Sequence, residues 1–430
     1  MKLAIVTPWP SDRSGIADYS YDLVTGLIKL GMSVTVFTLA DKVKPLEGCE
    51  IINSDCQFWA LNHFDEIIYH FGNNLAFHYH MYDLLKKHQG IVHLHDFVLH
   101  HLVAGLAQKH ATWPEYFSTL TRYYGPELSS KIKEGWDNAE YLWEGSEVVN
   151  FPMNEDIIAM SKGVITHSEY AKNKTHIKFP FKSVAKLPQV YNMAIEPSKT
   201  NKGFVLGVFG HVQPNKCLDV LLKSLASVES HNKTVVIRVV GAIADEAYHK
   251  KLLALLKPIK SWVSFESTGY VSDDEFIQQL NDCDLCIALR NPTMGETSAV
   301  VMRAIQLHTP AVVTDIGWYS ELPEFVYKIQ ASEDGIQELS TYLKQCLSEP
   351  NFMASLQKQA KIYCDENLSF ESVCHTYTDI LWEFKQNTGR PEVVPSLNNL
   401  SKALYDLNIV EINDKFKIRN RIYGKVVDLL

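Results

Sequence analysis

The chain has 430 residues, of which 46% are apolar and 21% are charged, and its formal net charge is −9. This composition is ordinary for a globular protein of two or three domains. The negative charge argues against nucleic acid as the main partner, because the phosphate backbone would be repelled. No stretch approaches the ~18 apolar residues of a membrane-spanning helix, and the start MKLAIVTPWP does not have the pattern of a secretory signal.

The eight cysteines lie at irregular spacing, which predicts free thiols in a reducing cytoplasm rather than a disulfide framework. Cys283 and Cys286 form a single CxxC without a second pair, so two small residues entering a buried strand explain it better than a zinc or redox site. Asp282 and Asp284 form a DxD tripeptide. It precedes a strand, at the sheet end away from the expected cleft, and we assign it no metal.

Short apolar runs, rich in β-branched residues and followed by turns and helical patterns, recur along the whole chain. The alternation predicts βαβ units and doubly wound parallel sheets, in which strands are buried on both faces. The expected strands of the first half are 3–8, 33–39, 66–72, 90–96 and 163–168. Those of the second half are 204–210, 234–241, 262–268, 285–290 and 310–317.

This alternation occurs twice, on either side of a polar connector at 191–203 that contains Pro and Gly. We therefore expect an α/β protein with two Rossmann-like domains, 1–190 and 204–365, facing each other across a cleft. Residues 102–160 form a helical, aromatic-rich insertion in the first domain. A helical tail, 366–430, starts by packing back on the first domain and then turns basic at 414–425.

Polar clusters follow several expected strands, and ligands of open parallel sheets bind at the carboxyl ends of strands. After the first strand, Gly15 lets the backbone come close to a ligand at the start of a helix. The alternative is a plain strand–helix turn. In the second domain, His211 and Lys216 lie around a turn that leads into a helix, where a lysine suits a diphosphate.

The stretch NPTMGETS, 291–298, connects a strand to a helix after Arg290. The amides of Thr297 and Ser298 in the first helical turn suit phosphate oxygens, and Gly295 permits a tight path. The carboxylate of Glu296 would repel phosphate but accepts hydrogen bonds from sugar hydroxyls. The alternative is that these residues only cap the helix.

A fourth cluster ends the strand at 90–96, where His95 is followed by Asp96. A histidine beside a carboxylate can orient or exchange a proton with a bound hydroxyl. Nine histidines fall between residues 70 and 110. No HExxH motif or carboxylate-rich ligand set accompanies them, so the sequence predicts no metal site and mostly structural or surface histidines.

With these residues in view, roughly residues 1–370 resemble glycosyltransferases of the GT-B fold, in the large retaining family 4. The resemblance rests on the Gly15 loop, on GHVQPNK, on GYVSDDEFIQQLNDCDLCIALRNP and on GETSAVVMRAIQLHTPAVVTDIG. Arg303 stands where the family has a second glutamate, and His211 with Lys216 replace its Arg/Lys pair. The pattern RxPxxGETS is similar to a bacterial subgroup that makes surface polysaccharide.

The resemblance implies roles for particular residues. Glu296 would contact the hydroxyls of the donor sugar, His211 and Lys216 the diphosphate, and His95 the reacting carbon. Catalysis is thereby expected from Glu296, Lys216 and His95, without a metal or cofactor. The expected donor-site residues are Gly15, His211, Lys216, Arg290, Gly295, Glu296, Thr297, Ser298 and Arg303, and those of the acceptor side are Asp18, Asn73 and Asp96.

The implied reaction transfers a sugar from a nucleoside diphosphate sugar to a hydroxyl of a glycan or lipid-linked acceptor, with retention, in surface-polysaccharide or lipopolysaccharide synthesis. The alternatives are a nucleotide-sugar epimerase on the same fold and a non-catalytic nucleotide-sugar-binding protein. The basic tail is a candidate contact with an anionic membrane, which would bring the protein to the inner face of the plasma membrane.

Overall fold

The structure, a computed structural model, describes residues 1–387 except 138–140, 142–144, 194–202, 229–232 and 244. By its internal contacts the chain divides into two units, Met1–Lys385 and Gln386–Leu430. The description below concerns the first unit. The basic tail and most of the expected connector lie outside the described residues.

The first sheet has seven parallel strands in the order β3-β2-β1-β4-β5-β6-β7. Three neighbouring strands, β4, β5 and β6, are buried over their whole length, as β-branched runs without alternation predict. The strands are β1 (Lys2–Val6), β2 (Ser33–Phe37), β3 (Glu50–Ile52), β4 (Glu66–Phe71), β5 (Ile91–Leu94), β6 (Gly163–Thr166) and β7 (Val184–Lys186).

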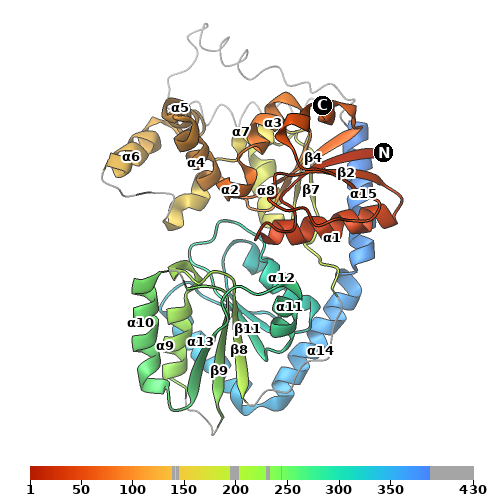
Figure 1. The fold of residues 1–430 in the computed structure, drawn as a ribbon. Coiled ribbons are helices and arrows are strands. Elements are labelled where there is room, and N and C mark those ends of the chain that lie inside the picture. Colours follow the sequence, from red (N-terminus) through yellow and green to blue (C-terminus); the bar gives the residue numbers. More distant parts are fainter. Residues whose placement is uncertain (138–140, 142–144, 194–202, 229–232, 244, 388–430) are drawn as a thin grey trace, which may run out of the picture. The chain divides into compact units, whose positions relative to one another are not determined.

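Helix α1 (Gly15–Lys29) follows β1 and begins at Ser14, whose side chain accepts a hydrogen bond from the N–H of Ile16. The expected insertion is helical and runs from α4 to α7 (Figure 1). The other helices of this domain are α2 (Leu75–His78), α3 (Met81–Lys87), α4 (His100–His110), α5 (Trp113–Tyr124), α6 (Pro126–Asp137), α7 (Glu155–Met160) and α8 (Glu169–Lys178).

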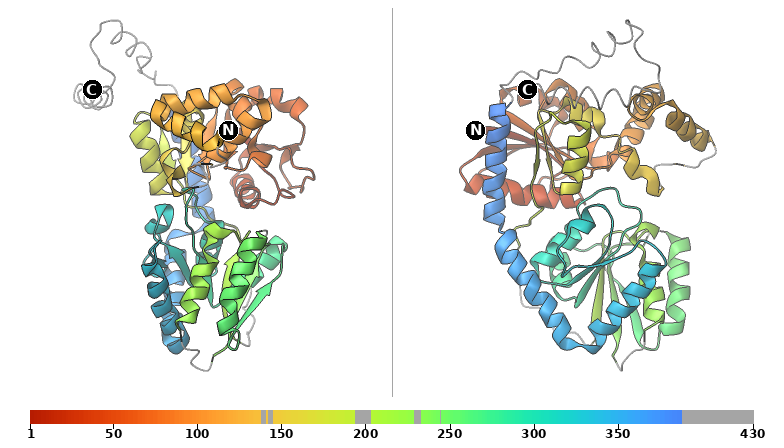
Figure 2. Two further views of the ribbon diagram at one scale, coloured as in Figure 1. Left: turned by 90° about the vertical axis from the view of Figure 1, so that its left-hand side faces the viewer. Right: turned by 180° about the vertical axis from the view of Figure 1, so that it is seen from behind.

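The second sheet has six parallel strands in the order β10-β9-β8-β11-β12-β13. Figures 1 and 2 show α9, α10 and α13 on one face and α11, α12 and α14 on the other. The strands are β8 (Phe204–Phe209), β9 (Val235–Val240), β10 (Val263–Ser267), β11 (Leu285–Ala288), β12 (Ala311–Thr314) and β13 (Tyr327–Ile329). The helices are α9 (Leu218–Ala226), α10 (Glu246–Leu256), α11 (Asp273–Asn281), α12 (Ala299–Gln306) and α13 (Asp334–Ser348).

Two long helices, α14 (Pro350–Asn367) and α15 (Phe370–Asn387), follow the second sheet. Helix α15 lies against the first domain (Figure 2): Cys374 and Phe370 pack where a side chain at Gly26 of α1 would be, and Phe384 packs on Gly163 of β6. Among the described residues, no helix is both long and apolar enough to cross a membrane.

All ten expected strands are present, and the expectation of two doubly wound parallel sheets is confirmed. The strands that the sequence did not predict are β3, β7 and β13, each of three residues and each at a sheet edge. An edge strand is covered on fewer sides than a central one and needs no long apolar run. Their patterns were too short and too polar to be recognised.

Candidate functional site

The loop between β11 and α12 forms the centre of the site. Its Gly295 has φ of +67°, and a Cβ there would lie 2.8 Å from the Cβ of Phe97, so both backbone conformation and space require glycine. Helix α12 begins after Ser298, whose hydroxyl accepts from the N–H of Val301 at 3.4 Å. Ser298 is thus the N-cap of α12, and the free amides of the first turn lie beside it.

Glu296 is held within this loop by several donors. One carboxylate oxygen accepts from the hydroxyl of Thr293 at 2.9 Å and from the N–H of Met294 at 2.6 Å. The other oxygen lies 2.9 Å from Nε of Arg290 and accepts from the Tyr319 hydroxyl at 3.4 Å. Burial disfavours the charge of Arg290, yet Tyr319 and Glu296 together keep its pKa above the usual value. The result is a buried, ordered pair of opposite charges.

Lys216 lies in the loop after β8, close enough to Arg290 and Glu296 to interact with their charges. The N–H of Asn291 donates to the carbonyl of Asn215 at 2.9 Å, which joins the two loops, and Nζ of Lys216 donates to the carbonyl of Phe209 at 3.2 Å. Burial, followed by the charge of Arg290, lowers the pKa of Lys216 to about 7, while Glu296 opposes this shift. An ammonium with so few partners would gain from a bound anion.

The first domain contributes Asp96, which follows β5. Its carboxylate accepts from the N–H of Asn73 at 2.7 Å. Burial raises the pKa of Asp96 to about 6, against the Asn73 hydrogen bond, and the charges of Glu296 and Arg290 act on it as well. The N–H of Val98 donates to the carbonyl of Met294 at 2.9 Å. These contacts bring a carboxylate of the first domain close to the cations and the carboxylate of the second.

The second domain matches a known family over most of its length. Residues 203–348 fit the family model described as Glycosyl transferases group 1, and this range contains Lys216, Arg290, Glu296 and Ser298. The domain belongs to the group 1 glycosyltransferases. No curated protein matches the sequence significantly.

Solved structures match the fold of nearly the whole chain. Alr3699/HepE of Anabaena in complex with UDP is 15% identical, with 89% of this chain and all of that one covered and a TM-score of 0.58. Sucrose-phosphate synthase of Thermosynechococcus elongatus is 11% identical, with 89% and 98% covered and a TM-score of 0.61. WaaG, a glycosyltransferase involved in lipopolysaccharide biosynthesis, is 15% identical, with 88% and 99% covered and a TM-score of 0.56. The expected GT-B fold is confirmed.

Within this glycosyltransferase fold, Arg303 lies away from Glu296, on the part of α12 nearer its end. Its guanidinium forms ion pairs with Asp273 of α11 at 2.7 Å and with Asp18 of α1 at 3.6 Å, and it stacks over Tyr191 with 4.3 Å to the ring centre. A glutamate there would face Asp18, Asp22 and Asp273 and be repelled. The surroundings therefore explain why this group 1 domain carries an arginine where the family has its second glutamate.

Arg303, Asp18 and Asp22 line a cavity of about 480 Å³ between the two α/β domains. Lys216, Arg290 and Glu296 do not line it. Burial raises the pKa of both Asp18 and Asp22 to about 6, and the charge of Asp273 adds to the rise for Asp18. The structure thus brings Arg303 and Asp18 together and separates them from the β11–α12 loop, and their donor and acceptor roles stay predictions.

The remaining predicted residues differ in their surroundings. Gly15 lies beside the start of α12, because a Cβ there would lie 3.5 Å from that of Ala299. His211 lies in the same loop as Lys216, and its side chain is exposed to solvent. The side chain of Asn73 forms hydrogen bonds within the first domain: its amide nitrogen bonds to Nδ1 of His101, and its amide oxygen accepts from the N–H of Leu102.

His95 points in another direction from Asp96. Its ring is 6% exposed, and Nδ1 hydrogen-bonds to His167 at 3.0 Å. Successive side chains along a strand project to opposite faces, so Asp96 meets the β11–α12 loop while His95 enters the domain interior. The catalytic role of His95 and the acceptor-side role of Asp96 both stay predictions.

Sequence reasoning missed Tyr319. This residue is 1% exposed and follows β12, in the short helix Gly317–Glu321, where its hydroxyl contacts Glu296, Arg290 and Ser298. Its position after the carboxyl end of a strand was the available signal, since every other part of the site follows a strand as well.

Proposed function

We propose that the chain is a retaining glycosyltransferase that moves a sugar from a nucleoside diphosphate sugar to a hydroxyl group. The observation that carries this proposal is the meeting of Lys216, Arg290 and Glu296 within a group 1 glycosyltransferase domain, next to Asp96 of the first domain. Cations, a carboxylate and the first turn of α12 together match the charges of a sugar diphosphate.

UDP-glucose is the first donor to test. Crystal structures of HepE, which shares the fold over 89% of this chain, hold UDP, UDP with glucose, and UDP-glucose. We propose a UDP-sugar for this chain on that ground. The acceptor that we propose is a glycan or lipid-linked hydroxyl in surface-polysaccharide or lipopolysaccharide synthesis, for which the fold shared with WaaG is the support. This function would place the protein in the cytoplasm.

In the proposed reaction the bond between the anomeric carbon and the diphosphate breaks, and its electron pair leaves with the diphosphate. Lys216, His211 when protonated and the amides near Thr297 and Ser298 stabilise that charge. The acceptor oxygen bonds to the anomeric carbon on the same face, and its proton passes to the leaving phosphate. These protein groups do the work that a divalent cation does in other transferases, so we propose that the transfer step needs no metal.

Glu296 has two tasks in this proposal. It orders the loop and Arg290 before the donor arrives. It then accepts hydrogen bonds from hydroxyls of the donor sugar, which replace the 3.4 Å contact with the Tyr319 hydroxyl. Asp96 is the group that we propose orients the attacking hydroxyl, by accepting a hydrogen bond from it before its proton passes to the leaving phosphate. With a pKa of about 6 it is mostly ionised at neutral pH, as this task requires.

The test compares nucleotides first and reaction products second. A thermal-shift screen of UDP, GDP, dTDP and ADP should raise the melting temperature with one base, and the rise should vanish in Lys216→Ala. The purified chain is then incubated with the matching sugar donor, with and without lipid extracts of the producing cells. Transfer to an acceptor supports the proposal, whereas an epimerised donor in the absence of acceptor, or binding without any turnover, contradicts it.

A further inference from the structure

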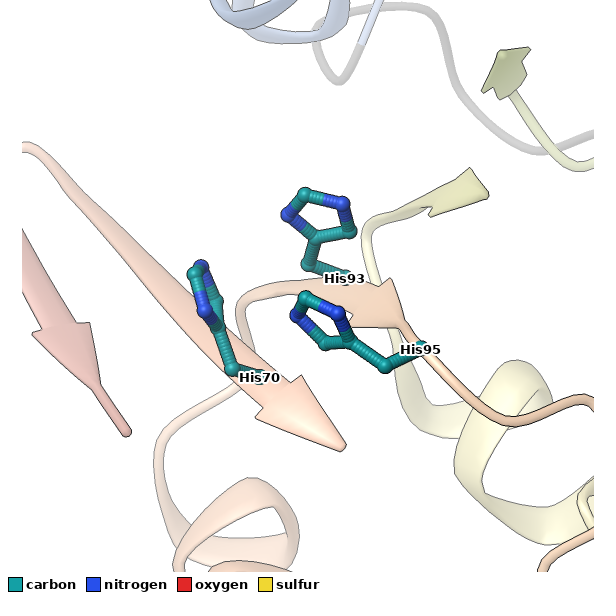
Figure 3. A group of neighbouring side chains, drawn as sticks. All are labelled: His70, His93 and His95. Atoms are coloured by element: carbon teal, nitrogen blue, oxygen red, sulfur yellow. The ribbon is translucent and has the colours of Figure 1, made fainter. Parts of the chain in front are cut away.

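Three histidines gather in the interior of the first domain, away from the site described above. His70 lies on β4, His93 on β5, and His95 directly follows β5. One ring nitrogen of each lies within 4.8 Å of the others, and Figure 3 shows the three rings collected on one side of these strands. His70 and His93 are fully buried and His95 is 6% exposed.

The fold explains why these rings meet. His70 and His93 are partners in the register of β4 and β5, and His93 and His95, two residues apart, project to the same face. The ring centres are 4.6–5.1 Å apart, and the His93 and His95 rings are stacked. Tyr19 of α1 closes the cluster, with its ring edge-on to His93 and His95.

The Nε2 atoms of all three rings are buried, and none has a hydrogen-bond partner in the described part of the chain. Buried polar atoms are nearly always paired, because an unpaired one has lost its water without replacement. Three such atoms from neighbouring residues are therefore unusual and call for a ligand.

The Nδ1 atoms, in contrast, each have a partner. His95 Nδ1 meets His167 Nε2 at 3.0 Å, and His167 Nδ1 lies 2.9 Å from the carbonyl of Leu187. A carbonyl only accepts, so His167 donates from Nδ1. Its Nε2 then accepts from Nδ1 of His95 when both rings are neutral. This chain leaves a lone pair on Nε2 of His95.

The same reasoning applies to His70. The Ser20 hydroxyl donates to the carbonyl of Ile16 at 2.7 Å, and its oxygen lies 2.8 Å from Nδ1 of His70. With its hydrogen already used, Ser20 accepts from His70, and Nε2 of His70 keeps its lone pair. His93 Nδ1 meets the Tyr377 hydroxyl at 3.4 Å, and Nε2 of His93 has no partner in the described part of the chain.

Burial is the main cause that lowers the pKa of His70 to about 3, and burial also lowers the pKa of His93 and His95, with neighbouring histidines adding to the shift.

We propose that His70, His93 and His95 form a buried binding site for a divalent transition-metal ion, with Zn²⁺ as the occupant. Imidazole nitrogens suit zinc, and three of them leave one tetrahedral position for a water. Three atoms at most 4.8 Å apart share a point no more than about 2.8 Å from each. A shift of roughly 0.7 Å per ring therefore reaches the zinc–nitrogen distance of about 2.1 Å.

The site also has the surroundings that metal sites require. Histidine ligands of metals almost always donate their second nitrogen to another group, which sets their orientation. Here Ser20 of α1, His167 after β6 and Tyr377 of α15 take that place. A bound ion would thereby link β4 and β5 to two covering helices, so its role is to stabilise the first domain.

The first experiment measures the metal directly. The full-length chain is stripped with a chelator, loaded with Zn²⁺ or Co²⁺, desalted and analysed by inductively coupled plasma mass spectrometry. We expect one ion per chain, a visible Co²⁺ spectrum of a four-coordinate site with nitrogen ligands, and a higher melting temperature with Zn²⁺. A folded chain that retains no ion and shows no shift in melting temperature would refute the site.

Variants then assign the ion to these residues. His70→Gln and His93→Gln should each remove the bound ion and the thermal shift. The matched control is His78→Gln, because His78 is also buried with an unpaired Nε2 but lies outside the group of three. If His78→Gln loses the ion equally, or if the two cluster variants keep it, the ion binds elsewhere and the proposal is wrong.

Ser20→Ala is a milder change, which tests the site even if His70→Gln or His93→Gln does not fold. Ser20→Ala removes the acceptor for Nδ1 of His70 and leaves all three ligands in place. Loss of such an outer partner typically weakens metal affinity by about 10–100-fold. We expect this change in the Zn²⁺ dissociation constant measured by competition with a chelator. An unchanged constant would contradict the arrangement inferred for His70.

Discussion

The carboxylate of Glu296 lies 2.9 Å from Nε of Arg290, and both side chains are less than one-fifth exposed. Thr293 and Met294 donate to the other oxygen of the same carboxylate. The charges of the site are thus ordered before a substrate is bound, and Lys216 is within electrostatic reach of both members of the pair. Fixed charges of this kind need no reorganisation during the reaction, which is the physical advantage of an ordered site.

The first prediction concerns Lys216. Replacement by alanine removes the cation that stabilises the leaving diphosphate, and we expect kcat/KM for the sugar donor to fall by about a hundredfold or more. The measurement is initial-rate kinetics with the donor found in the thermal-shift screen. Lys223→Ala serves as the control, because Lys223 is an exposed lysine on the neighbouring helix α9. Near wild-type rates in Lys216→Ala would defeat the assignment.

A second prediction separates the charge of Glu296 from its shape. Glu296→Gln keeps the size of the side chain but loses one of the acceptor oxygens that order Arg290 and Thr293. We expect a loss of roughly a hundredfold in kcat, with a far-ultraviolet circular dichroism spectrum like that of the wild type. Glu383→Gln, an exposed position on α15, should change nothing. If Glu296→Gln were fully active, Glu296 would have no part in transfer.

The third prediction is a bell-shaped dependence of kcat/KM on pH, with its maximum between about 6 and 7. Asp96 presents a carboxylate to orient the attacking hydroxyl only when ionised, so the rate should rise as pH increases through about 6. Lys216 attracts the diphosphate only when protonated, so the rate should fall as pH increases through about 7. The profile of kcat/KM reports the free enzyme, where these pKa values apply.

Two variants test the two limbs of the profile separately. Lys216→Arg carries a permanent charge, so the decline above pH 7 should disappear even if the absolute rate is lower. Asp96→Asn should remove the rise through pH 6 together with most of the activity. A decline above pH 7 that persists in Lys216→Arg would assign the alkaline limb to another group.

The fourth prediction is a loss of stability in Arg303→Ala. The change leaves Asp18 and Asp273 without their ion-pair partner and removes the stacking on Tyr191. Both aspartates are partly exposed, so we expect about 2 kcal/mol rather than the roughly 3–5 kcal/mol of a fully buried pair. Urea unfolding followed by tryptophan fluorescence measures it. Lys361→Ala breaks a solvent-exposed pair with Asp365 and should cost about 0.5 kcal/mol or less.

The fifth prediction concerns the metal requirement of transfer. We expect initial rates recorded directly after EDTA is added to equal those without it, and Mg²⁺ or Mn²⁺ to give no increase. An immediate loss of activity that Mg²⁺ restores would contradict a metal-free transfer step. A slow loss that parallels a falling melting temperature would instead report the buried histidine site.

Much of the architecture could be predicted because its signals are local. Ten strands, most of them buried, were recognised from apolar runs rich in β-branched residues, and Gly295 and Ser298 from a turn that leads into a helix. The short edge strands were not recognised, since three residues with partly exposed side chains carry too little pattern. Tyr319 was missed because its partners come from other loops.

The two parallel sheets, the loops that carry the charges and the strand ends where those loops lie can be predicted from the amino-acid sequence, because they depend on neighbours along the chain. Which of the predicted residues meet depends on how the strands and helices pack in the folded protein. This packing joined Arg303 to Asp18 and Asp273 and turned His95 away from Asp96. It also brought His70 to His93 and His95, since pairing between strands, and not distance along the chain, determines which side chains share a face.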